Sequence, residues 1–467
     1  MSSASARIKP FHLFAHRDGN YVIRVEAMTA ARLDGETATI LEDVQRQPNS
    51  PLGPHQVEAL ARLGLLGDTH DSPRKGKAPR ADPVSYIVLL VTQSCNLRCV
   101  YCYGDGGGYG SGGNLSPQTA RKAVDWLIEQ SGAVKNLSIQ FFGGEPLARF
   151  SLLRDIVAYA RKRAEEAGKT MRFTMVTNGS LLDDEKIGFV KEHAIQTVIS
   201  FDGPRAIQDA QRPLASGKGS YEAIVPNLRR MLLVMPETIC QAMVLGDTDP
   251  REVKRALQEI GFKRIAFAIA SPSLFDHKGA GAPAARPIGG LLGLMEEESE
   301  QWLAYTKNRD LEGLELFRRR GGILSDAVAQ LVHGERMYFH CGAGRKLVGV
   351  ATSGDVFLCH RFVGQDTYKL GTVFEKELRR EAYQQSPVEY AEPCMNCFAR
   401  YHCGGGCMHD NAGIGGSVFS PSEDMCRIYQ RRVELAAWVT CQFDESDRAF
   451  LVDQDIIPPK FCPLDFP

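Results

Sequence analysis

The sequence lacks both long hydrophobic stretches and a net excess of charge. None of its apolar runs approaches the roughly 20 residues that a membrane-spanning helix needs, so no membrane contact is expected. The formal net charge of −1 gives no electrostatic reason to expect binding to nucleic acid or to an anionic membrane surface. The opening residues, Met1–Ala4, do not start a basic region followed by an apolar core, so no signal peptide is expected. We therefore expect a cytoplasmic protein.

Cysteine, in contrast, is abundant, with 13 residues in a chain of 467. Cytoplasmic thiols stay reduced, so cysteines there are more often ligands than disulfide partners. A hydrophobic content of 43% and a charged content of 24% are ordinary for a globular protein, and the length allows two to four domains. We expect bound metal to explain most of these thiols.

The most specific short motif contains Cys95, Cys99 and Cys102, directly after the apolar run Tyr86–Val91. Spacings of three and two residues suit a loop around one face of an iron–sulfur cluster, which short runs of thiolates hold. Three thiolates leave the fourth iron of a cubane open to bind a small molecule. The alternatives are zinc, which favours C-x2-C pairs, and unliganded buried thiols.

From residue 84 onward, strand and helix patterns alternate. Six βα units predict an α/β fold with a parallel sheet closed into a partial (β/α)6 barrel, and functional residues at the carboxyl ends of the strands. The expected strands are Ser85–Val91, Asn136–Phe142, Arg172–Thr177, Thr197–Phe201, Ile239–Leu245 and Arg264–Ala270. The expected helices are Pro117–Gln130, Leu152–Ala167, Asp184–His193, Tyr221–Leu233 and Arg251–Ile260.

Residues 1–70 have the pattern of a separate unit. Two apolar runs flank Arg17–Asn20, a strong hairpin signal, and a third short run and two helical patterns follow. A winged-helix-like module is predicted, with an extension packed on the main body as the alternative. The remaining divisions are a linker (71–83), the barrel (84–310), a helical bridge (311–340), an irregular cysteine-rich domain (341–440) and a tail (441–467). We expect ligand bonds rather than a large core to organise the last ~125 residues.

The second expected strand ends in the turn Gly143-Gly144-Glu145-Pro146. Paired glycines let the backbone approach a ligand closely, and the Glu145 carboxylate is suited to attract an ammonium group. Taken alone, the motif is better interpreted as a strand-ending turn. Asn178 follows the third strand and Asp202 the fourth, which makes Asp202 a candidate base, with turn capping as the alternative.

Seven further cysteines lie in the C-terminal part of the chain. They are Cys341, Cys359, Cys394, Cys397, Cys403, Cys407 and Cys426. Three glycines between Cys403 and Cys407 supply loose backbone for wrapping a metal. A zinc-stapled, non-enzymatic binding scaffold would explain the closely spaced members of this group, but not the three cysteines at the mouth of a barrel.

Together, the three cysteines and the glycine turn resemble the radical S-adenosylmethionine superfamily, and the seven-cysteine pattern resembles its SPASM extension. The resemblance implies that Cys95, Cys99 and Cys102 hold a [4Fe–4S] cluster whose open iron binds S-adenosylmethionine and that its cleavage yields a 5′-deoxyadenosyl radical. It further implies cofactor contacts from Tyr101, Gly143, Gly144, Glu145, Pro146, Asn178, Ser200 and Arg212. For Ser200 and Arg212, turn residues before a helix are the alternative interpretation.

The same resemblance implies two auxiliary [4Fe–4S] clusters, so three clusters in all. One is held by Cys394, Cys397, Cys403 and Cys426, and the other by Cys341, Cys359 and Cys407. The second has one thiolate too few, so its fourth ligand is another side chain, a residue from elsewhere, or nothing. An open iron there would suit a substrate thiolate. His360 is a candidate proton acceptor or hydrogen-bond donor beside this group, with packing as the alternative.

A barrel, auxiliary clusters and a small N-terminal module resemble maturases of ribosomally made peptides that form Cys-to-carbon thioether cross-links. The resemblance is strongest to SCIFF-type enzymes and, slightly more, to the maturation protein of quinohemoprotein amine dehydrogenase. It implies a precursor peptide or a small Cys-containing subunit as substrate, with its leader added as a strand to the module. It also implies an electron donor such as flavodoxin or ferredoxin. The alternative enzyme is an anaerobic sulfatase-type maturase, which oxidises Cys or Ser to formylglycine.

Overall fold

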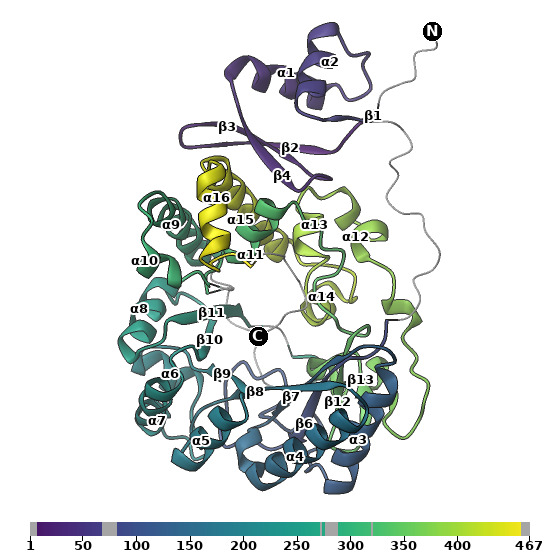
Figure 1. The fold of residues 1–467 in the computed structure, drawn as a ribbon, viewed down its shortest axis with the longest axis vertical. Helices are drawn as coiled ribbons and strands as arrows, with labels where there is room; N and C mark the ends of the chain where they lie inside the picture. Colours follow the sequence, from purple (N-terminus) through teal and green to yellow (C-terminus); the bar gives the residue numbers. More distant parts are fainter. Residues whose placement is uncertain (1–6, 68–81, 271–272, 276–287, 319–320, 459–467) are drawn as a thin grey trace.

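A mostly parallel sheet of nine strands forms the frame of the described chain (Figure 1). The structure is a computed structural model, and it describes residues 7–67, 82–270, 273–275, 288–318 and 321–458. Six parallel strands are β6 (Tyr86–Thr92), β7 (Asn136–Gly143), β8 (Thr170–Thr177), β9 (Gln196–Ser200), β10 (Ile239–Val244) and β11 (Arg264–Ile269). They run in an open arc and confirm the six predicted barrel strands.

Helices cover the outer side of this arc. They are α3 (Pro117–Gln130), α4 (Phe150–Glu166), α5 (Asp184–Glu192), α6 (Arg205–Gln211), α7 (Tyr221–Val234) and α8 (Pro250–Ile260). Alternate residues of β6, such as Ile87 and Leu89, are fully buried against Trp126 and other helix residues, as the period of two in a strand requires. Five of these helices confirm the predicted ones, whereas α6 was not predicted.

The C-terminal part of the chain extends the same sheet. The strand β12 (Leu347–Val350) pairs in parallel with β6, and β13 (Asp355–Phe357) and β14 (Lys369–Thr372) continue it as antiparallel strands. The order along the sheet is therefore β11-β10-β9-β8-β7-β6-β12-β13-β14. The cysteine-rich segment is thus joined to the barrel by backbone pairing at the strand that leads into Cys95.

A second hydrophobic core lies above the barrel, and it corrects one expectation. Its helices are α9 (Ile288–Lys307), α10 (Leu311–Glu315), α11 (Ser325–His333), α15 (Glu423–Cys441) and α16 (Glu445–Asp453). Three short helices, α12 (Pro387–Tyr390), α13 (Arg400–Cys403) and α14 (Met408–Gly415), contribute to smaller buried clusters. Leu435 and Val439 of α15 are completely buried with Trp302 of α9 and Leu451 of α16. The prediction that ligand bonds rather than a core organise this segment is therefore wrong for its last helices. No described helix is long and apolar enough to cross a bilayer.

The N-terminal unit has its own small core. Its sheet consists of β2 (Phe11–His16), β3 (Gly19–Arg24) and β4 (Thr29–Leu33), in that order, with α1 (Gly35–Arg46) and α2 (Pro54–Arg62) above it. A short pair, β1 (Arg7–Ile8) with β5 (Leu66–Gly67), completes the unit. Val22, Leu41 and Leu60 are buried between sheet and helices. Most of the predicted linker, residues 71–83, lies outside the described residues.

The other face of this sheet packs on the body of the protein. Tyr21 and Ile23 are 0% and 1% exposed and belong to the same core as α9, α11 and α15. At the rim, Trp438 Nε1 donates to Asp18 Oδ1 at 3.1 Å. The imidazole of His12 stacks on Phe398, with ring centroids 3.5 Å apart and planes within 1°. The N-terminal unit is therefore both a small module with its own core and an extension packed on the body.

Replacing Ile23 with alanine tests this shared core. Loss of the buried side chain is expected to lower the free energy of unfolding by about 2–5 kcal/mol and to make the N-terminal unit more susceptible to protease. Chemical denaturation of the full chain measures the first effect. The matched control, Val57→Ala on the exposed side of α2, should change stability by less than about 0.5 kcal/mol. Equal effects of the two substitutions would contradict a shared core.

Candidate functional site

The cysteine loop, residues 95–102, follows β6 at the carboxyl end of the parallel strands. Burial raises the pKa of Cys95 to about 11 and that of Cys99 to about 12, and each is also raised by the charge of Cys102. The three predicted thiols are therefore close enough to interact. The Leu97 amide donates to Cys95 Sγ at 3.4 Å. Hydrogen bonds from amides to sulfur are a known feature of iron–sulfur sites. Buried thiols with raised pKa values also need a bound cation in order to ionise, and a cluster would provide it.

Backbone contacts place the glycine turn against this loop. The Gly144 amide donates to the Thr92 carbonyl at 2.9 Å, and the Glu145 amide donates to the Ser94 carbonyl at 3.0 Å. A Cβ atom at Gly143 would overlap the Thr92 oxygen, and one at Gly144 would overlap the Ser94 oxygen. Only glycine allows the two strand ends to approach this closely. The turn therefore lies directly beside the residue that precedes Cys95.

The Glu145 side chain does not play the part that the sequence predicts. It is 0% exposed, and its Oε1 atom accepts hydrogen bonds from the Leu147 amide and the Thr177 hydroxyl at 3.0 and 2.7 Å. Its Oε2 atom accepts one from the Asn178 amide at 2.9 Å. These bonds tie the turn to β8, and they argue against a direct contact between the carboxylate and a ligand's ammonium group. Pro146, which is buried, begins a short 3-10 helix after the turn.

Asn178 links the ends of two strands to the cysteine loop. Its Nδ2 atom donates to Asn96 Oδ1 at 3.0 Å and to Cys95 Sγ at 3.8 Å. Ser200 is the last residue of β9 and lies opposite Gln241 of β10. Asn178 therefore touches a predicted ligand cysteine, and Ser200 lies at the same edge of the sheet.

Three predicted site residues form one buried group. Asp202 is 0% exposed, and its Oδ2 atom accepts a hydrogen bond from the Tyr101 hydroxyl at 2.5 Å. Arg212 Nε lies 2.9 Å from the same oxygen, and Asp202 Oδ1 accepts from the Met243 amide at 2.9 Å. The guanidinium of Arg212 also lies 5.3 Å from the centroid of the Tyr101 ring. Both carboxylate oxygens of Asp202 are thus already engaged, which does not suit the predicted role as a base.

The C-terminal cysteines gather in the two predicted groups. Burial raises the pKa of Cys394 to about 11 and that of Cys403 to about 12, and the charges of Cys397 and Cys426 raise both further. Gln430 Nε2 donates to Cys397 Sγ at 3.6 Å. These four thiols form the first group, which lies beside His12 and Phe398 of the interface with the N-terminal unit.

The second group contains Cys341, Cys359 and Cys407. Burial raises the pKa of Cys341 to about 11 and raises that of Cys359 further, with Cys407 adding to both shifts. Arg361 Nη1 donates to Cys407 Sγ at 3.3 Å and to Asp410 Oδ1 at 3.1 Å. Among the thiols that the structure describes, no fourth one interacts with this group.

An aromatic layer separates the cysteine loop from the second group. His360 lies 4.5 Å from Phe142 at the end of β7 and 6.2 Å from Tyr103, centroid to centroid. Tyr103 in turn lies 5.5 Å from His409. Burial lowers the pKa of His360 to about 3, so its imidazole is neutral near pH 7. Tyr103, His409 and Arg361 were not predicted, although their positions within two residues of ligand cysteines were a usable signal.

The spacing of the side chains bears on the zinc alternative. Thiolates around one Zn²⁺ lie within about 4 Å of each other because each Zn–S bond is about 2.3 Å long. Within residues 7–67, 82–270, 273–275, 288–318 and 321–458, no three His, Cys, Asp or Glu side chains could together hold one metal ion. The described residues therefore do not form a compact zinc site.

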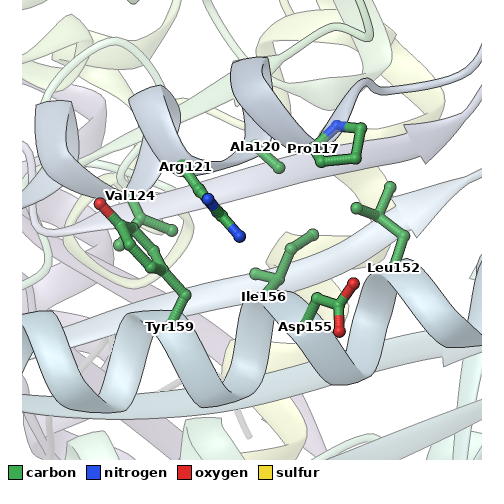
Figure 2. A pocket seen from close by; sticks show the side chains of 8 residues that line it. All are labelled: Pro117, Ala120, Arg121, Val124, Leu152, Asp155, Ile156 and Tyr159. Carbon is green, nitrogen blue, oxygen red and sulfur yellow. The ribbon is translucent and has the colours of Figure 1, made fainter.

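A cleft on the outside of the barrel is not a second candidate. It lies between α3 and α4, and Figure 2 shows Arg121, Asp155 and Tyr159 among its lining residues. Its volume of about 20 Å³ holds no more than a single water molecule. The chemistry-bearing side chains described above all lie elsewhere.

Known proteins with similar sequences include a sulfatase-maturating enzyme. The chain is 26% identical to the serine-type anaerobic sulfatase-maturating enzyme of Bacteroides thetaiotaomicron, over 71% of this chain and 84% of that enzyme. It is 29% identical to an uncharacterised protein of Methanocaldococcus jannaschii, over 42% of this chain and 66% of that relative, just under two thirds of its length.

The fold has a counterpart among solved structures. Native anSMEcpe with bound AdoMet and Cp18Cys peptide matches with a TM-score of 0.60 and 20% identity, covering 75% of this chain and 96% of that one. The model of the radical SAM superfamily matches residues 89–260, which include the cysteine loop, the glycine turn and Asp202. The similarity to the radical SAM superfamily therefore covers the part of the chain that forms the candidate site.

Proposed function

We propose that this protein is a maturase that uses S-adenosylmethionine and three [4Fe–4S] clusters to modify a ribosomally made peptide or a small Cys-containing subunit. The observation that carries the proposal is the gathering of ten thiols into groups of three, four and three, with the first group at the carboxyl ends of the barrel strands. A binding scaffold needs no incompletely liganded thiol group at the carboxyl ends of parallel strands. Catalysis at an open iron requires such an incompletely liganded group.

The cysteine loop would hold the cluster that binds S-adenosylmethionine. Cluster and S-adenosylmethionine together supply one-electron chemistry that removes a hydrogen atom from an unactivated C–H bond. The backbone of Gly143 and Gly144 lies beside the loop and offers polar groups to the amino acid part of the ligand. Asn178, through its hydrogen bond to Cys95 Sγ, orients the loop. A low-potential donor such as flavodoxin or ferredoxin would provide the electron.

The two C-terminal groups would hold the auxiliary clusters. The group of four closes its site with thiolates, whereas Cys341, Cys359 and Cys407 leave one position for another ligand. A thiolate of the substrate suits that position, because Tyr103 lies close both to Cys102 of the cysteine loop and to Cys359 of this group. A substrate cysteine bound there would therefore lie near the hydrogen-abstracting centre. A neutral His360 imidazole is then available as a hydrogen-bond partner for the peptide.

We favour thioether formation between a cysteine and a carbon atom, as in the maturation of quinohemoprotein amine dehydrogenase. An incomplete auxiliary site suits a reaction that consumes a substrate thiol. The N-terminal unit supports a peptide substrate, because its outer strands β2 and β4 each pair on one side only within the described chain. A leader peptide would add there as a further strand.

Formylglycine formation is the second candidate. It is favoured by the similarity to a sulfatase-maturating enzyme over most of both chains. The solved structure of similar fold, native anSMEcpe, contains a bound Cp18Cys peptide. Both candidates share the radical chemistry and differ in the fate of the substrate's sulfur.

Removal of one thiol from the cysteine loop tests the radical chemistry. Cys95→Ala is expected to abolish reductive cleavage of S-adenosylmethionine, measured by chromatography after anaerobic reduction with dithionite, and to lower the bound iron by about one cluster. The matched control is Cys240→Ala, which removes a buried thiol that interacts with none of the three groups. Retained cleavage in Cys95→Ala would contradict the assignment.

A thiol of the auxiliary group gives a different expected result. Cys394→Ala should retain uncoupled cleavage of S-adenosylmethionine and lose at least ~90% of peptide modification, because the auxiliary clusters act on the peptide rather than on the cofactor. Mass spectrometry of the peptide and chromatography of the cleaved cofactor give both values from one reaction. Normal peptide modification by this variant would show that the auxiliary cluster is dispensable.

The fate of the substrate separates the two candidate reactions. Thioether formation removes two hydrogen atoms from the peptide and one titratable thiol, and leaves no carbonyl group. Formylglycine formation from cysteine releases the sulfur and leaves an aldehyde that reacts with hydrazides. Mass spectrometry before and after alkylation and hydrazide labelling measures both. An aldehyde product would replace the thioether assignment while retaining the radical one.

A further inference from the structure

We infer that Asp202 and Arg212 are positioning residues that fix the backbone of the cysteine loop and balance charge beside its cluster. The inference rests on the proposed function in that the loop holds an iron–sulfur cluster. It gives Asp202 a role other than that of a base.

The cysteine loop has little regular structure of its own, and a neighbouring segment supplies its backbone partners. The Arg98 amide donates to the Pro213 carbonyl at 2.8 Å, and the Val100 amide donates to the Gln211 carbonyl at 3.0 Å. In the opposite direction, the Ala215 amide donates to the Asn96 carbonyl at 2.8 Å. Residues 96–100 and 211–215 thus form a short antiparallel ribbon, with a bridge between Leu97 and Leu214.

Arg212 lies in the middle of this ribbon, and its side chain is only 7% exposed. A buried guanidinium needs a counter-ion, because an unpaired charge in the interior costs several kcal/mol. Asp202, 0% exposed, is that counter-ion at 2.9 Å. The carboxylate also receives the Tyr101 hydroxyl, from the residue between Val100 and Cys102. One carboxylate therefore holds both strands of the ribbon, one through Arg212 and the other through Tyr101.

The position of Asp202 is itself fixed by two neighbouring elements. The Met243 amide of β10 donates to its Oδ1 atom at 2.9 Å. Its own amide donates to Gln208 Oε1 at 2.8 Å, and Gln208 Nε2 donates to Ser220 Oγ at 2.8 Å. The carboxylate is thus held by the sheet and by α6. Its contacts with Tyr101 and Arg212 then fix the position of the cysteine loop.

Charge balance follows from the same geometry. Arg212 is close enough to Cys99 to oppose the effect of burial on that thiol, and Asp202 acts on it in the other direction. The pair is neutral as a unit, so the cluster has neither an unpaired cation nor an unpaired anion beside it. Removing one charge leaves the other uncompensated in a site of low dielectric constant, where it acts strongly on a redox centre.

The two single variants are therefore expected to change the reduction potential of this cluster in opposite directions. Asp202→Asn leaves the guanidinium unpaired, which stabilises the added electron and raises the potential. Arg212→Gln leaves the carboxylate unpaired and lowers the potential. Each shift should be roughly tenfold in the ratio of reduced to oxidised cluster, equal to about 59 mV for one electron. The double variant should return close to the wild-type value.

The measurement is a redox titration followed by electron paramagnetic resonance on the anaerobically purified full chain. The signal that changes when S-adenosylmethionine is added identifies the cluster of the cysteine loop. The matched control is Asp447→Asn, which removes a carboxylate 2% exposed between Lys307 and Arg309, and it should leave the potential unchanged.

The outcomes separate this inference from the proposed function. Opposite shifts with recovery in the double variant support it, as does a cluster lost from both single variants and retained in the double variant. Equal potentials, shifts of the same sign, or equal iron loss from all three variants would overturn it. A wild-type protein with no cluster that responds to S-adenosylmethionine would instead refute the proposed function.

Discussion

Two backbone hydrogen bonds between the ends of β6 and β7 determine the geometry of the whole site. They run from Gly144 to Thr92 and from Glu145 to Ser94, and they bring the glycine turn against the start of the cysteine loop. This contact requires glycine at two successive positions, since any Cβ there would overlap a carbonyl oxygen. The Glu145 carboxylate stabilises this contact by accepting hydrogen bonds from Thr177 and Asn178 at the end of β8. The thiols, the turn and Asn178 then share one edge of the sheet.

The other parts of the molecule are tied to this edge rather than appended to it. The strand β12 pairs with β6, so the segment that contains Cys341 and Cys359 is positioned by the same strand that positions Cys95. The helix α15 contains the last cysteine of the group of four, Cys426, and also forms the core that buries Tyr21 of the N-terminal sheet. The three thiol groups and the N-terminal unit therefore belong to one continuous packing arrangement.

Local patterns in the sequence were sufficient to predict the barrel strands and most of their helices, whereas the grouping of the seven C-terminal thiols came from the resemblance to the SPASM extension. The apolar run of β6 and the helical periodicity of α3 are features of short segments, and cysteine spacing is local as well. The orientation of individual side chains was not predictable from these local patterns. Glu145 reads as a free carboxylate, but its oxygens turn inward to Thr177 and Asn178. Asp202 reads as a base, although its partners Tyr101 and Met243 are each about 40 or more residues away in the chain. The core around α15 was missed for the same reason, because its apolar partners come from both ends of the protein.

That core also has a consequence for how the chain is synthesised. Val22, Leu41 and Leu60 can form the small N-terminal core as soon as the first 67 or so residues have emerged from the ribosome, since domains fold as units during synthesis. Tyr21 and Ile23 lie on the opposite face of the same sheet, and Trp438 of the same core is synthesised only after the barrel. An apolar surface on the nascent chain therefore remains uncovered while the barrel is being translated. The outer face of the N-terminal sheet is therefore buried only after α15 has been synthesised.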